Sequence, residues 1–109
     1  MNWQTLCKSS DLIDNAGVCA KFNEEQVALF SLFEGEQQTL FALGNWDPIG
    51  KANVLSRGVL GSIGEEFVVA SPLYKQHFSL LTGKCLEDEN VSVPVYQVRI
   101  QNDLVEIAA

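Results

Sequence analysis

The sequence predicts an all-β domain, an antiparallel β-sandwich or barrel of many short strands. Two observations support this prediction. Turn-forming residues recur at short intervals along the 109-residue chain, and the segments between them are rich in Val, Ile, Leu and Phe. No stretch has the apolar spacing of a helix, and the best candidate, residues 9–14, would make at most two turns. The length suits one domain, and we expect a single domain over residues 1–109.

Apolar periodicity identifies the strands in order. Val18 and Ala20 alternate with Cys19, which is the pattern of a strand with one buried face. Segments 26–32 and 67–70 are apolar on both faces, as central strands would be.

The end of the chain reads as a hairpin. Segments 95–100 and 104–107 are strand-like, and Asn102-Asp103 lies between them as the turn. We expect the first and last strands to lie near each other. The predicted core consists of Val18, Phe30, Phe67, Val69, Val98 and Ile107.

The charge balance limits the kinds of partner. The net charge is −7, from 14 acidic and 7 basic residues. Nucleic acid and anionic membranes are excluded as partners because phosphate binding needs a basic surface. No signal peptide is visible in residues 1–11 and no apolar run could span a bilayer, so we expect a cytoplasmic protein. An acidic chain suits docking onto a protein with a complementary basic patch.

The cysteines and the lone histidine offer little chemistry. The chain has three cysteines, Cys7, Cys19 and Cys85. Because their number is odd and no pair has C-x-x-C spacing, we expect free thiols. We expect Cys19 to be buried in its strand and Cys85 to be accessible. His77 could contact Cys85 across a turn, but nothing near the thiol indicates an activated nucleophile. No zinc, calcium or nucleotide motif is present, so no catalytic, metal or cofactor-binding residues are predicted.

Residues 54–85 carry a more specific pattern. A Leu-Ser-Arg-Gly piece at residues 55–58 leads through a glycine-containing turn to a strand at residues 66–70. Ser-Pro-Leu-Tyr follows at residues 71–74, and then Phe78, Leu80 and the Thr-Gly turn of residues 82–83. This order resembles the second half of a Rieske domain, in which two Cys and two His hold a two-iron cluster.

The resemblance implies a Rieske-like fold without an iron–sulfur cluster. Ser71 stands at the Cys position of the second ligand motif and Tyr74 at its His position. In the first motif, Asn45 stands for the Cys and Asp47 for the His. Asn, Asp, Ser and Tyr cannot replace thiolates and imidazoles as a ligand set for such a cluster.

Nearly the whole chain is similar to the small subunit of cytoplasmic NAD(P)H-dependent assimilatory nitrite reductase. The shared motifs are Asn-Trp-Asp-Pro at residues 45–48, Val-Leu-Ser-Arg-Gly at 54–58, Ala-Ser-Pro-Leu-Tyr-Lys at 70–75 and Cys-Leu-Glu-Asp-Glu at 85–89. The resemblance implies a non-catalytic stabilising or docking subunit of an oxidoreductase that reduces nitrite to ammonium in nitrate assimilation. Its partner would be a large subunit carrying FAD, a 4Fe–4S cluster and siroheme, and this chain would hold no cofactor.

Two alternatives remain open. One is a Rieske ferredoxin of a dioxygenase system, which would need the missing ligands. The other is a free-standing domain that binds a small ligand in a polar pocket formed by the four vacated positions. In the leading interpretation the two loops still meet, and Trp46 and Tyr74 are candidate docking residues flanked by Arg57 and Lys75. Trp46 and Tyr74 could instead pack against each other in place of the cluster.

Overall fold

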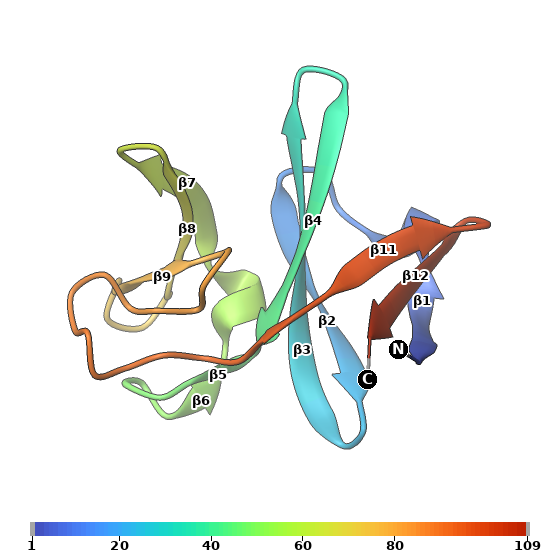
Figure 1. Cartoon of the computed structure of the whole chain (residues 1–109). Helices are drawn as coiled ribbons and strands as arrows, with labels where there is room; N and C mark the ends of the chain where they lie inside the picture. Colours follow the sequence, from blue (N-terminus) through green and yellow to red (C-terminus); the bar gives the residue numbers. More distant parts are fainter. Residues whose placement is uncertain (1, 109) are drawn as a thin grey trace.

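A computed structural model describes residues 2–108 and shows three larger antiparallel sheets side by side, with a fourth sheet of two short strands (Figure 1). The central sheet has the order β10-β4-β3-β2. Its strands are β2 (Ala16–Phe22), β3 (Glu25–Glu34), β4 (Gln37–Gly44) and β10 (Val95–Tyr96). The pairing of β3 with β4 runs without a register shift from Val27↔Gly44 to Glu34↔Gln37.

Two further sheets flank the central one (Figure 1). The first has the order β1-β12-β11, with β1 (Trp3–Lys8), β11 (Val98–Gln101) and β12 (Leu104–Ala108). The second has the order β7-β8-β9, with β7 (Val59–Ile63), β8 (Glu66–Ala70) and β9 (His77–Ser79). The short hairpin β5 (Trp46–Asp47) and β6 (Ala52–Asn53) follows β4, and two 3₁₀ turns complete the chain, η1 (Ser9–Asp11) and η2 (Leu55–Arg57). The predicted all-β antiparallel architecture is confirmed.

The core consists of two clusters, one on each face of the central sheet. Alternate residues of β3 enter opposite clusters, because successive strand side chains point to opposite faces. Phe30 belongs to the cluster shared with β8 and β9, whereas Leu29 belongs to the cluster shared with β12. Segment 26–32 was predicted to be a central strand because it is apolar on both faces, and this prediction is confirmed.

The predicted core is correct in part. Phe30, Val69 and Ile107 are fully buried. Val18, Phe67 and Val98 are only half-buried and pack against the rims of the two clusters. The expected proximity of the first and last strands is confirmed, because β1 pairs with β12 along its length.

The last strands differ from the prediction in one respect. The expected single strand of residues 95–100 is divided between two sheets: β10 pairs with β4, and β11 pairs with β12. The hairpin turn at Asn102-Asp103 is confirmed, with φ values of 54° and 64°. Both central residues of a type I′ turn need this left-handed conformation, which Asn and Asp tolerate. No helix within residues 2–108 has the length and hydropathy needed to cross a membrane.

Candidate functional site

The vacated first ligand loop is organised by Asp47, whose side chain is fully buried. One carboxylate oxygen, Oδ1, accepts hydrogen bonds from the backbone N–H groups of Ile49 (2.8 Å) and Gly50 (3.0 Å). The Asp47 carbonyl accepts a further bond from the Lys51 N–H at 2.7 Å. Asp favours turns because its side chain can bond the backbone two residues on. The carboxylate therefore shapes the turn between β5 and β6.

The second loop is joined to the first by a direct hydrogen bond. The Ser71 hydroxyl donates to Oδ2 of Asp47 at 2.5 Å, and both side chains are buried. Ser71 also closes its own loop, because its N–H donates to the Gln76 carbonyl and its carbonyl accepts from the Lys75 N–H. The expected approach of the two loops is confirmed. The bond that joins them was not foreseen from the sequence, although both residues were singled out.

Asn45 does not point into the gap between the loops. Its Nδ2 donates to Oε1 of Gln26 at 3.0 Å, and its Oδ1 accepts from the backbone N–H of Ser56 at 2.7 Å. Asn45 thus ties the end of β4 to β3 and to η2. A buried amide needs partners for both its donor and its acceptor, and Gln26 and Ser56 supply them.

The four positions do not fit a two-iron cluster. Asn45 bonds β3 and η2, Asp47 and Ser71 bond each other, and the Tyr74 side chain is 66% exposed. No group of three or more His, Cys, Asp or Glu side chains in residues 2–108 could hold a metal ion. The same geometry corrects the idea of one polar pocket formed by all four residues, because Asn45 bonds β3 and η2 and the Tyr74 side chain is largely exposed.

Apolar side chains cover the outside of the joined loops. Trp46 is 49% exposed on the first loop, and on the second loop Leu73 is 45% and Tyr74 66% exposed. We call these three residues the loop patch. Between residues 2 and 108 the only aromatic ring pair is Phe22 with Tyr96, so Trp46 and Tyr74 do not stack on each other. Leu73 was not predicted; it packs over Gly50, where an added Cβ would lie 2.4 Å from the Leu73 Cδ1.

The two basic residues predicted to flank the aromatics are both exposed. Arg57 ends η2, and Lys75 follows Tyr74 in the left-handed conformation with φ of 62°.

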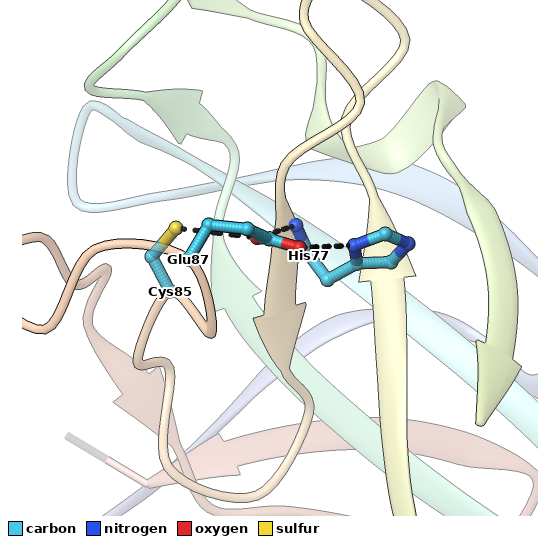
Figure 2. A network of polar contacts seen from close by, with 3 residues as sticks. All are labelled: His77, Cys85 and Glu87. Atoms are coloured by element: carbon cyan, nitrogen blue, oxygen red, sulfur yellow. Dashed lines mark hydrogen bonds and ion pairs between the residues drawn. The ribbon is translucent and has the colours of Figure 1, made fainter. Parts of the chain in front are cut away.

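A carboxylate separates the only histidine from the nearest thiol (Figure 2). One oxygen of Glu87, Oε2, lies 2.6 Å from Nδ1 of His77, and the other accepts the His77 backbone N–H at 2.8 Å. The Cys85 thiol donates to that second oxygen at 3.7 Å. Glu87 therefore bonds both groups, and the thiol and the imidazole are not paired as a nucleophile with its base. We call these contacts of Glu87 with His77 and Cys85 the clasp.

The clasp predicts a pH effect on stability. The His77 backbone N–H, the largest cause, and the His77 side chain hold the pKa of Glu87 below its ordinary value of 4.5. A lowered pKa adds stability that is present above pH 4.5 and is lost as the pH falls through the folded-state value. We expect wild type to melt above Glu87→Gln at about pH 6, and the difference to shrink towards about pH 3. A difference in melting temperature that stays constant over this range would contradict the clasp.

The structure reverses the expected exposure of the cysteines. Cys19 is exposed and Cys85 is buried in the cluster beside Phe78. Cys19 lies on β2, an edge strand, on the face opposite Val18, whereas Cys85 forms an isolated β-bridge with Phe78. We therefore expect a thiol reagent to modify Cys19 of the native protein first and Cys85 last. Mass spectrometry of partly labelled protein measures the order, and faster labelling of Cys85 would contradict the structure.

Comparisons with known proteins agree with this geometry. A family model described as a Rieske-like [2Fe-2S] domain matches residues 2–108. The ferredoxin of carbazole 1,9a-dioxygenase from Nocardioides aromaticivorans IC177 has the same fold, with a TM-score of 0.76 at 17% identity over 99% of this chain and 98% of that one. At such low identity the likeness concerns the fold alone.

Closer relatives are components of nitrite reductases. The nitrite reductase (NADH) small subunit of Salmonella typhimurium (strain LT2) is 44% identical over 96% of this chain and 95% of its own. The NMR structure of the Escherichia coli protein NirD has a TM-score of 0.84 at 42% identity, covering 97% of this chain and 94% of that one. The nitrite reductase [NAD(P)H] large subunit of Klebsiella oxytoca is 40% identical over 94% of this chain, but the match covers only 10% of that protein. The chain belongs to the nitrite reductase small-subunit family, whose fold is the Rieske-like domain.

Proposed function

We propose that this protein is a non-catalytic subunit of a cytoplasmic NAD(P)H nitrite reductase, which reduces nitrite to ammonium in nitrate assimilation. The observation that carries the proposal is similarity over nearly the full length of both chains to a nitrite reductase (NADH) small subunit. The chain acts as one Rieske-like domain, and two of the four positions that would hold a cluster, Asp47 and Ser71, fasten two loops together.

The proposed partner is the large subunit. The relative in Klebsiella oxytoca supports this choice, because there a region similar to this chain is part of a large subunit itself. Fusion of the two components in one polypeptide also supports one small subunit for each large one. FAD, a 4Fe–4S cluster and siroheme are assigned to the large subunit, where the electrons of NAD(P)H reach nitrite.

The proposed docking surface is the loop patch, flanked by Arg57 and Lys75. Trp46 and Tyr74 combine large apolar area with a polar group, which suits anchors at a protein interface. Their exposure in the isolated chain supports a role in association, since a residue that serves only the fold gains little from facing water.

The test is association with the large subunit. We expect wild-type protein to bind the purified large subunit in a 1:1 complex, measured by calorimetry. Trp46→Ala and Tyr74→Ala should each weaken binding about tenfold or more, while the melting temperature of the isolated subunit stays within about 2 °C of wild type. Ile13→Ala is the matched control, because Ile13 is also exposed (57%) but lies outside the loop patch.

Two results would contradict the proposal. Absence of any complex would remove the functional assignment. Stoichiometric iron and the visible absorption of a two-iron cluster after anaerobic purification would instead favour the ferredoxin alternative.

A further inference from the structure

One edge of β4 is open over most of its length. β4 pairs with β3 along its whole course, but on its other side β10 covers only Ala42 and Leu43. The chain then leaves at Gln97, and β11 diverges towards the sheet that contains β12 (Figure 1). Within residues 2–108, no strand pairs with residues 37–41 on this side. We call residues 37–41 the open edge.

Backbone donors and acceptors point out of the open edge. The N–H of Gly44 donates to the Pro94 carbonyl, so Gly44 faces the β10 side. In an antiparallel strand, backbone polar groups alternate between the two neighbours. Since the register of β4 has no shift, Leu40 and Gln38 present their N–H and C=O groups on the same side as Gly44. Such an edge is a template for another strand.

Grooves lie on both faces of the open edge. On the face towards β7 and β8, a groove of about 660 Å³ is lined by Thr39, Phe41, Ile63, Phe67 and Leu81, with Glu65 and Glu66. Leu81 is 75% exposed and Ile63 is 44% exposed. On the face towards β11, a second groove of about 390 Å³ is lined by Gln38, Thr39 and Leu40 with Val98, Arg99 and Ile100. A strand added to β4 would direct alternate side chains into the two grooves.

We propose that an extended segment of the large subunit binds here by adding a strand to β4. Main-chain hydrogen bonds to Gln38 and Leu40 supply affinity, and the grooves select the side chains. The segment carries an apolar residue for the larger groove and a basic residue next to it, which meets the carboxylates of Glu65 and Glu66. This inference rests on the proposed function and adds a second contact region to the loop patch.

Charge favours the large subunit over a second copy of this chain as the occupant. Each copy carries a net charge of −7, and pairing two open edges would bring two such chains together. Like charges across an interface oppose association.

Two pairs of variants test the proposal in the complex with the large subunit. Gln38→Pro removes the outward N–H, and Gln38→Ala is its control, because both variants lose the Gln38 bond to Ser31 but only Pro blocks strand addition. Leu81→Asp places a charge in the larger groove, and Ile13→Asp is its control on an exposed apolar residue elsewhere. We expect Gln38→Pro and Leu81→Asp each to raise Kd about tenfold or more. Gln38→Ala, which changes the lining of the second groove but keeps the backbone N–H, should raise Kd clearly less than Gln38→Pro, and Ile13→Asp should change Kd less than about threefold.

Hydrogen–deuterium exchange gives an independent reading on the wild-type protein. We expect peptides covering residues 37–41 to exchange more slowly in the complex than in the free subunit, because bound amides are hydrogen-bonded. If the complex forms but Leu81→Asp binds normally and this exchange is unchanged, the open edge is not the docking site, although the proposed function stands. If wild type forms no complex, the proposed function itself fails. Dimers of the subunit alone that Leu81→Asp abolishes would assign the edge to a second copy and overturn the proposal.

Discussion

Asp47→Ala is expected to lower the free energy of unfolding by about 3 kcal/mol or more. The substitution leaves the partly buried N–H groups of Ile49 and Gly50 without their acceptor and the buried Ser71 hydroxyl without its partner. Each buried group that loses its partner costs about 1–3 kcal/mol. Urea denaturation followed by tryptophan fluorescence measures the effect, and it reports on this region because Trp46 is the neighbouring residue.

Two further variants separate the bonds of Asp47. Asp47→Asn keeps an acceptor for the turn and can donate to the Ser71 hydroxyl, so we expect about half the loss of Asp47→Ala. Ser71→Ala removes the bond between the loops, together with the longer bond that the hydroxyl accepts from the Leu73 N–H at 3.3 Å, and should cost about 1–2 kcal/mol. A loss below about 0.5 kcal/mol for Asp47→Ala would show that the loops are held by other contacts.

Phe78→Ala is expected to cost about 3–5 kcal/mol. Phe78 is fully buried on β9, directly after the loop that contains Ser71, and it belongs to the cluster that joins the central sheet to β8. Truncation leaves a cavity that the surrounding strands cannot fill, because both sheets are fixed by their own hydrogen bonds.

The comparison with Phe67→Ala tests the assignment of the core. Phe67 is half-buried and lines the larger groove beside the open edge, so we expect a smaller cost of about 2 kcal/mol. The sequence had suggested a full core role for Phe67. Equal losses for the two variants in urea denaturation would show that Phe67 is as much a part of the core as Phe78.

Much of the fold could be predicted because strand periodicity is a local signal. Segment 26–32 is apolar at every position from Val27 to Leu32 except Ser31, and it forms the central strand β3. The division of residues 95–100 between two sheets could not be predicted in this way. Tyr96 and Val98 follow the same alternation, and periodicity does not say which neighbour each residue pairs with.

The sequence could predict which positions belong to the candidate site, but not which of these residues bond each other. The resemblance located Asp47 and Ser71 correctly as loop positions, but their mutual bond depends on how two loops 24 residues apart meet. The resemblance placed Asn45 at the vacated site, but its hydrogen-bond partners, Gln26 and Ser56, could not be predicted because both are distant from it in the sequence. The exposure of Cys19 followed from the alternation with Val18, which was the available signal for correcting that prediction.

The bond between Asp47 and Ser71 makes the loss of the iron ligands hard to reverse in evolution. Asp47→His deprives two partly buried N–H groups of their acceptor, and Ser71→Cys weakens the donor that meets the carboxylate. Either substitution lowers the free energy of unfolding by itself, whereas a two-iron cluster can stabilise the domain only when all four ligands are present. A chain with this pair would therefore have to pass through less stable variants before it could hold a cluster.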